Sequence, residues 1–295
     1  MTPADAPRAA GSRKALDLTN PGTVQAVARR AGVFAGRRLG QHFLVDRLAL
    51  EAIVATLAPS GDDDVLEVGC GIGTLTGELA AGARRVVAVD VDPACVRATA
   101  ITQRSRANVD AVEADARTLD PGAYGLEPPW LAAGNLPYRL TGAILSHLYE
   151  RPHPPARGVF LVQREVAARL AAPAGGWSLA TVALRSLADI ERVADIGPQS
   201  FDPPPAVHSS VIRMLPRSDV DIRARAHVIT LARLVFQQRR KTLRHGMTHA
   251  LAGDAVAAAR VLEAGAIDPQ RRPGTLSLDE WDRLARAVAA LRRHA

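Results

Sequence analysis

The chain has 295 residues, of which 47% are hydrophobic and 23% are charged, and its formal net charge is +7. This length and composition exclude wholesale disorder and predict one large domain with a smaller one. No apolar run approaches the roughly 18 residues of a membrane span, and the first twenty residues lack the apolar core of a signal peptide, so we expect a cytoplasmic protein with no membrane contact.

From about residue 23 to residue 163 the chain alternates between helical and extended patterns. A helix over 23–31 and a basic, glycine-flanked loop over 36–46 come first. The expected strands are 65–68, 85–90, 109–112, 130–133 and 159–162, and the expected helices are 48–57, 74–81, 93–104 and 141–150. This alternation predicts an α/β fold with a doubly wound, Rossmann-like parallel sheet and right-handed crossovers.

The pattern changes after Glu191. Two extended segments flank a proline-rich loop between 192 and 216, which indicates an antiparallel edge of the sheet, and everything from about 221 onward is helical. We therefore expect three parts: a partly disordered N-terminal extension over 1–35, an α/β domain over 36–218, and a small all-helical domain over 219–295.

A glycine-rich stretch after the first long strand indicates a nucleotide site. Gly69 and Gly71 let the backbone approach a ligand closely, and Asp90 ends the next strand, where a carboxylate can accept ribose hydroxyls. This pair alone does not separate NAD from S-adenosylmethionine. Glu67, just before the first glycine, suits a cofactor without pyrophosphate, and Asp115 can bond an adenine amino group. These two acids favour S-adenosylmethionine.

Five motifs occur in one order along the chain. They are GQHFLVD (40–46), LEVGCGIGTLT (66–76), VVAVD (86–90), EADA (113–116) and GNLPY (134–138). In this order they resemble the rRNA adenine-N6,N6-dimethyltransferases, which comprise the small-subunit enzymes and the erythromycin-resistance enzymes of the large subunit. The resemblance runs from about residue 36 to residue 290.

Four later stretches resemble the small-subunit branch. They are VQREVAARL (162–170), FDPPPAVHSSVIRM (201–214), FQQRRKTLRHGM (236–247) and AIDPQRRPGTLSLDEWDRLA (266–285). This resemblance implies S-adenosylmethionine-dependent dimethylation of two adjacent adenines in the 3′-terminal hairpin loop of small-subunit (16S) rRNA. The expected partner is that rRNA within the assembling 30S subunit, and the expected state is a monomer.

Two alternatives stay open. One is a large-subunit (23S) rRNA methyltransferase that confers macrolide resistance, and the other is a non-catalytic RNA-binding assembly factor. The second alternative is disfavoured because the chain keeps the motif residues Gly69, Asp90, Asp115 and Asn135.

The resemblance also implies a set of cofactor-binding residues. They are Gln41, His42, Leu44, Gly69, Gly71, Asp90, Asp115 and Asn135. The chain departs from the family at His42, where asparagine is usual, and an imidazole can still hydrogen-bond the cofactor. The first 35 residues have no counterpart in the family pattern.

The GNLPY motif contains no titratable acid or base, and its chemistry is expected to be positional. The N6 amine of adenine is a poor nucleophile, and two acceptors can turn its lone pair toward a methyl sulfonium. The Asn135 side-chain oxygen is one candidate acceptor, and the backbone carbonyl of Leu136 or Pro137 is the other. We expect Tyr138 to stack on the flipped adenine and Phe201 to cover its other face.

A basic run predicts contact with RNA phosphates. From Arg223 to His245 there are six arginines, one lysine and no acid. The expected phosphate contacts are Arg37, Arg38, Arg239, Arg240, Lys241 and Arg244. A solvated helix face is the alternative for such a run. Cys70 and Cys95 have no metal-ligand pattern around them, so we expect two buried, reduced thiols and no metal.

Overall fold

A computed structural model describes residues 16–33, 41–217 and 222–293. Its first helix, α1 (Pro21–Ala31), begins where the side chain of Asn20 accepts from the N–H of Thr23 and ends at Gly32 in the left-handed conformation. Asparagine before the first turn and glycine after the last turn are common helix boundaries. The sequence-predicted helix over 23–31 is confirmed within two residues.

A seven-stranded sheet forms the centre of the α/β part, and its order is β4-β3-β2-β5-β6-β9-β7. The parallel strands are β2 (Asp64–Val68), β3 (Arg85–Asp90), β4 (Val109–Glu113), β5 (Leu131–Asn135) and β6 (Arg157–Gln163). Strands β7 (Ala188–Ile196) and β9 (Ser209–Pro216) are antiparallel and form one edge. The strand order reverses between β2 and β5, where doubly wound sheets bind ligands. The predicted fold class is confirmed.

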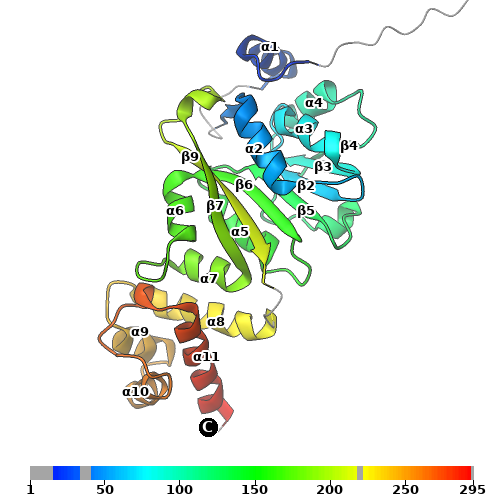
Figure 1. Cartoon of the computed structure of the whole chain (residues 1–295). Coiled ribbons are helices and arrows are strands. Elements are labelled where there is room, and N and C mark those ends of the chain that lie inside the picture. The colour runs from blue at the N-terminus through cyan, green and yellow to red at the C-terminus, as the bar shows by residue number, and fades with distance from the viewer. Residues whose placement is uncertain (1–15, 34–40, 218–221, 294–295) are drawn as a thin grey trace, which may run out of the picture.

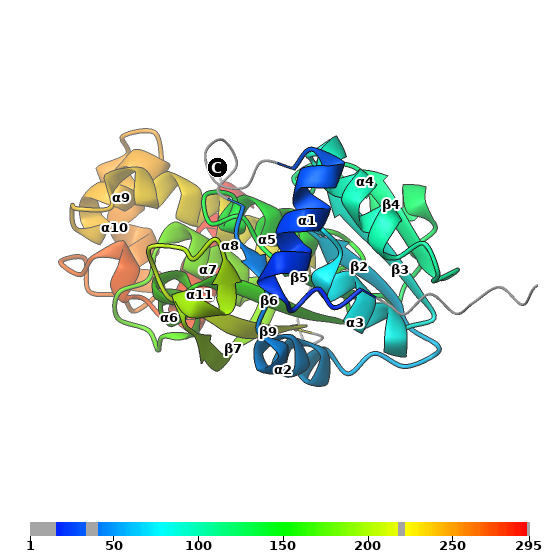
Figure 2. The same ribbon diagram turned by 90° about the horizontal axis from the view of Figure 1, so that it is seen from above.

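Helices cover both faces of this sheet (Figure 2). They are α2 (Arg47–Leu57), α3 (Thr74–Gly82), α4 (Pro93–Thr102), α5 (Thr141–Tyr149), α6 (Arg164–Ala171) and α7 (Leu179–Leu187). Successive strand residues point to opposite faces: Val65 packs in the core under α2 and α3, and Leu66 packs in the core under α5, α6 and α7. The sequence did not predict α6 or α7.

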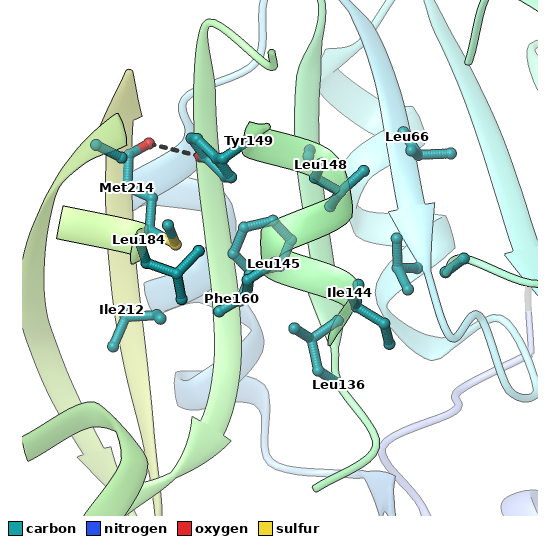
Figure 3. Packing of buried hydrophobic residues seen from close by; sticks show 14 of the residues in the cluster. Leu66, Leu136, Ile144, Leu145, Leu148, Tyr149, Phe160, Leu184, Ile212 and Met214 are labelled. Carbon is teal, nitrogen blue, oxygen red and sulfur yellow. Dashed lines mark hydrogen bonds between the residues drawn. The ribbon is translucent and has the colours of Figure 1, made fainter. Parts of the chain in front are cut away.

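The core under α5 reaches the GNLPY motif. Figure 3 shows Leu136 beside Ile144 of α5, and both side chains are almost fully buried. At the other end of this cluster the Tyr149 hydroxyl donates to the carbonyl of Met214 at 3.1 Å. The leucine of the motif is thus an anchor in the core, and it fixes the backbone of its neighbours.

A second, two-stranded sheet joins distant parts of the chain. Strand β1 (Phe43–Leu44) pairs antiparallel with β8 (Phe201–Asp202), and Leu44 lies opposite Phe201. The short 3₁₀ helix η2 (Pro198–Ser200) leads into β8, and the Ser200 hydroxyl donates to the Asp46 carboxylate at 2.6 Å. This pairing, which the sequence did not predict, holds the FDPPP segment against the start of the α/β part.

The C-terminal region is helical and lies at one end of the sheet, opposite α1 (Figure 1). It comprises α8 (Ile222–Val235), η3 (Phe236–Gln238), α9 (Leu243–Ala250), α10 (Ala255–Ala264), η4 (Pro273–Thr275) and α11 (Leu278–Arg293). The remaining 3₁₀ helix of the described residues outside this region and η2 is η1 (Pro121–Tyr124), in the α/β part. These helices pack around the fully buried Trp281, and Trp177 and Val182 from the α/β part join the same cluster. The proposed domain boundary at 218/219 falls between β9 and α8, outside the described residues, and stays a prediction.

Within the described ranges, no helix combines the length and the apolar character that crossing a bilayer requires.

Candidate functional site

A cavity opens at the carboxyl ends of β2, β3, β4 and β5. Its walls come from all five sequence motifs and include every residue that was predicted to bind the cofactor, together with Leu136, Pro137 and Tyr138. These residues are Gln41, His42, Leu44, Gly69, Gly71, Asp90, Asp115 and Asn135, with Glu67 at the floor. Parallel strands bring their carboxyl ends to one edge, which explains why motifs far apart in sequence meet here.

The glycine loop after β2 fixes the Asp90 carboxylate. The Gly71 N–H donates to one carboxylate oxygen at 3.1 Å, and the Asp92 N–H donates to the other at 2.9 Å. Burial raises the pKa of Asp90 above its usual value. Gly69 has φ +77°, and a Cβ there would lie 3.2 Å from the carbonyl oxygen of Asn135. Glycine at this position therefore lets the loop and the GNLPY motif approach each other closely.

Glu67 lies at the base of the cavity and is 1% exposed. Its Oε2 atom is buried and has no hydrogen-bond partner among the described residues. Burial raises the pKa of this carboxyl from 4.5 to about 8. A cationic or hydrogen-bond-donating neighbour would stabilise the ionised form of such a buried carboxyl.

Asp115 also lines the cavity, and it forms an ion pair with Arg117. The guanidinium of Arg117 donates to both of its carboxylate oxygens, at 3.0 and 2.5 Å. The backbone N–H of Arg117 also donates to Oδ1, at 2.9 Å. These hydrogen bonds lower the pKa of Asp115. The carboxylate is therefore ionised and held in one orientation at the cavity.

The charge of the cavity indicates its ligand. Glu67, Asp90 and Asp115 line it, and no lysine or arginine is among the lining residues that the structure describes. S-adenosylmethionine carries a sulfonium and an amine. The unpartnered Glu67 oxygen and the acceptor oxygens of Asp90 and Asp115 fit these groups and the hydroxyls of its ribose.

Gln41 and Leu44 form the wall contributed by the N-terminal motif. The Gln41 amide donates to the Asp92 carboxylate at 3.2 Å, and Leu44 is buried in the core with one side toward the cavity. Both buried cysteines are free thiols, as predicted.

The Asn135 amide has a defined orientation. Its Nδ2 donates to the backbone carbonyl of His42 at 2.9 Å, and because a carbonyl only accepts, the side-chain oxygen is left as the free acceptor. The Pro137 carbonyl already accepts from the Leu140 N–H at 2.9 Å and the Thr141 hydroxyl at 3.3 Å. The Leu136 carbonyl has no hydrogen-bond partner among the described residues. Of the two backbone acceptors left open by the sequence, Leu136 is therefore the available one.

The Tyr138 ring is held on two sides. Its hydroxyl lies 2.7 Å from the Ser209 hydroxyl, and burial raises its pKa. The imidazole of His42 lies nearly parallel to the ring, with the two centroids 6.4 Å apart and the planes at 23°. The imidazole is in turn bound through Nδ1 to the Pro203 carbonyl at 2.7 Å. The FDPPP segment and β9 thus position both rings.

Phe201, which was predicted to cover the other face of the adenine, is not among the residues that line this cavity, and its stacking role stays a prediction. It is 3% exposed and packs in the core cluster that contains Leu44, its partner across β1 and β8. The two-stranded pairing turns its side chain inward. The sequence also missed Ser209 and Arg117, whose contacts depend on chain segments brought together only by the fold.

The four basic residues predicted in the helical region lie together. Arg239, Arg240 and Lys241 form the turn after η3, and Arg244 is in the first turn of α9. All four are exposed. Arg37 and Arg38 lie outside the described residues. No cluster of potential metal ligands occurs in the described part of the chain.

Comparisons with known proteins agree with this geometry. The chain is 38% identical over 277 residues to the ribosomal RNA small subunit methyltransferase A of Anaeromyxobacter sp. (strain K), covering 90% of this chain and 97% of the relative. The enzyme of the same name from Rhodococcus opacus (strain B4) is 36% identical, with 97% and 99% covered.

Two solved structures share the fold. The 23S rRNA methyltransferase ErmE is 26% identical with a TM-score of 0.66, covering 84% of this chain and 99% of that one. A dimethyladenosine transferase from Plasmodium falciparum is 22% identical with a TM-score of 0.69, with 82% and 96% covered. The family described as "Ribosomal RNA adenine dimethylase" matches residues 35–288. The chain belongs to the ribosomal RNA adenine dimethylase family.

Proposed function

We propose that this protein uses S-adenosylmethionine to dimethylate the N6 amines of two adjacent adenines in the 3′-terminal hairpin loop of small-subunit rRNA. The observation that carries the proposal is the fixed amide of Asn135, whose Nδ2 is bound to His42 and whose oxygen is left to accept from an amine. Whole-length similarity to relatives named for the small subunit supports this target over the large subunit.

Different residues of the cavity contact different parts of the cofactor. Asp90 accepts the ribose hydroxyls and Asp115 accepts from the adenine amine. Gln41, His42, Leu44 and the Gly69–Gly71 loop enclose the methionine part, and Glu67 balances its positive charge. When bound, the cofactor supplies a methyl group already activated on a sulfonium.

The protein's role in methyl transfer is to orient the target amine. The Asn135 oxygen and the Leu136 carbonyl each accept one N–H, which turns the nitrogen lone pair toward the methyl group. Positioning of this kind supplies up to roughly 7–11 kcal/mol of a barrier. The proton leaves to water afterwards, so no general base is required and the motif needs no titratable side chain.

The base itself is held by stacking on Tyr138. Stacking on an aromatic ring contributes about 1–3 kcal/mol per base, which is comparable to the few kcal/mol that unstacking the adenine costs. This balance favours an aromatic residue at position 138 over another aliphatic one.

The exposed basic residues Arg239, Arg240, Lys241 and Arg244 dock the RNA through its phosphates. Such contacts bind without reading sequence, so the target is chosen by the shape of the assembling small subunit. The active state that we propose is a monomer. The named relatives are bacterial, and bacterial subunits assemble in the cytoplasm, where we place the reaction.

The test uses unmodified small and large ribosomal subunits as substrates for the purified protein with labelled cofactor. We expect dimethyladenosine in the small subunit alone. Label confined to the large subunit would establish the resistance-type activity, for which the similarity to ErmE is the supporting observation. Binding to small subunits without transfer of label would establish a non-catalytic assembly factor.

A further inference from the structure

Arg139 follows Tyr138 directly and is the one charged residue between positions 132 and 140. It is the third residue of a turn that the Leu140 N–H closes by donating to the Pro137 carbonyl at 2.9 Å. Its side chain is exposed, whereas Pro137 and Leu140 line the cavity. The turn therefore holds a cation at the mouth of the cavity, next to the ring on which the adenine is proposed to stack.

The side chain of Tyr138 passes the end of a neighbouring strand. Strand β6 lies between β5 and β9 in the sheet. Tyr138 follows β5, and its hydroxyl lies 2.7 Å from the hydroxyl of Ser209, the first residue of β9. Ser209 pairs in register with Gln163, the last residue of β6. The hydroxyl end of Tyr138 is therefore close to the point where α6 begins, at Arg164.

Arg164 is a second exposed cation at this place. Its backbone N–H donates at 3.0 Å to the carbonyl of His208, the residue before Ser209. Its neighbour Glu165 is also exposed and offsets part of its charge. Arg139, by contrast, has no acidic residue within ten positions along the chain. One arginine thus lies at the backbone end of the tyrosine and the other lies near its hydroxyl end.

A flipped adenine brings negative charge to this mouth. Only the base enters a site of this kind, so the phosphates on its two sides remain outside. Phosphate contacts fix the position of a nucleic acid without reading its sequence, and the planar fork of N–H donors on arginine matches a phosphate. A nucleotide whose base lies on Tyr138 therefore has its phosphates where the two arginines can reach them.

We propose that Arg139 and Arg164 bind the phosphates on the two sides of the target adenosine and hold this nucleotide in the flipped position, with Arg139 as the stronger contact. This inference rests on the proposed adenine methylation. The site differs in role from the four basic residues near α9, which dock the RNA whether or not the base has flipped. Contacts made only by the flipped nucleotide affect the rate of methyl transfer more than the binding of the subunit.

Three substitutions separate charge from size. Arg139→Gln and Arg164→Gln remove the charge and keep a polar side chain, and Arg139→Lys keeps the charge. The matched control is Arg169→Gln, an exposed arginine in the last turn of α6. Unmodified small subunits are methylated in a single turnover, which gives the rate at saturating protein and the protein concentration for half of that rate. Calorimetry gives the Kd of S-adenosylmethionine, and thermal unfolding shows that each variant is folded at the assay temperature.

We expect the saturating rate to fall about tenfold in Arg139→Gln and about threefold in Arg164→Gln. The half-saturating concentration and the cofactor Kd are expected to stay within about twofold of wild type, because neither subunit docking nor the cofactor walls are altered. Arg139→Lys is expected to keep the rate within about threefold, and Arg169→Gln within about twofold.

An unchanged rate in Arg139→Gln would overturn the proposal. So would an Arg139→Lys variant as slow as Arg139→Gln, because the charge would then have no effect. A higher half-saturating concentration at an unchanged rate would assign Arg139 to docking, and a weaker cofactor Kd would assign it to the cofactor wall; either result overturns the proposal. Wild-type protein that binds small subunits and transfers no methyl refutes the proposed function instead.

Discussion

The side chain of Asn135 donates to the backbone carbonyl of His42 at 2.9 Å, across 93 positions of the chain. This single hydrogen bond joins the GNLPY motif at the end of β5 to the residue before β1. It fixes the orientation of the amide, because the nitrogen is occupied and the oxygen is free. A neutral side chain thereby becomes a directed acceptor.

Replacing Asn135 by alanine is expected to lower the rate of methyl transfer by about 10²–10³-fold, since a preorganised hydrogen-bonding group at a reacting centre contributes that much. Cofactor Kd is expected to change by less than threefold. The matched control is Asn108→Ala, because Asn108 also donates to backbone carbonyls, those of Ala80 and Ala83, away from the cavity. Equal rate losses in the two variants would show that Asn135 acts through stability alone.

Gly134 and Gly142 form a second matched pair. A Cβ at Gly134 would lie 2.2 Å from the backbone oxygen of Val68 on the neighbouring strand, whereas nothing lies within 4 Å of a Cβ at Gly142 in α5. Gly134→Ala is expected to lower the free energy of unfolding by about 3 kcal/mol or more. Gly142→Ala is expected to raise it by about 0.4–1 kcal/mol. Urea denaturation measures both, and an unchanged midpoint for Gly134→Ala would contradict the close strand packing.

The pKa of Glu67 gives a pH dependence with a defined sign. The folded carboxyl has a pKa of about 8 against an ordinary value of 4.5, so between these values the folded state binds the extra proton. Stability of the cofactor-free protein therefore falls as pH rises through this window, by up to about 1.4 kcal/mol per unit. Glu67→Gln should flatten the fall, and the same change at the exposed Glu78 should preserve it. Urea denaturation at pH 5 and pH 8 tests this, and a wild-type protein equally stable at both would contradict it.

Cofactor binding should displace that proton. A cationic ligand beside Glu67 favours the ionised carboxyl, because opposite charge lowers its pKa. Calorimetric titration at pH 7 in two buffers of different ionisation enthalpy is expected to reveal proton release by the wild type and none by Glu67→Gln. Identical heats in both buffers for the wild type would mean that Glu67 stays protonated beneath the cofactor.

The exposed basic residues should determine how RNA binding depends on salt. Alanine at Arg239, Arg240, Lys241 or Arg244, one at a time, is expected to weaken binding to small subunits. Each is expected to reduce the slope of log K against log salt by about 0.7–0.9. Arg104→Ala, an exposed arginine after α4, is the charge-matched control and should leave the slope unchanged. If all five variants kept the wild-type slope, these four residues would not contact the RNA phosphates.

The sheet and the cofactor walls could be predicted from sequence because their signals are local. Apolar runs such as 85–90 end in an acid, and parallel strands bring such ends together. Helices α6 and α7 were missed because PAGGWS (173–178), between them, interrupts the helical periodicity. Strand β1 has two residues, too few for any pattern, and its partner β8 lies far along the chain. The burial of Phe201 follows from that pairing, so no local sequence pattern could predict it.

The pairing of β1 with β8 also bears on how the protein matures. Residues 41–144, which supply the cavity walls, are synthesised well before Pro203 and Ser209, which fix the rings of His42 and Tyr138. Domains generally begin to fold from the N-terminus during synthesis. A nascent chain can therefore complete the walls of the cofactor cavity before the residues that position the two rings have been synthesised. It can bind an RNA base only after the segment from Pro203 to the start of β9 has been added. The order of translation separates the two binding events in time within one polypeptide.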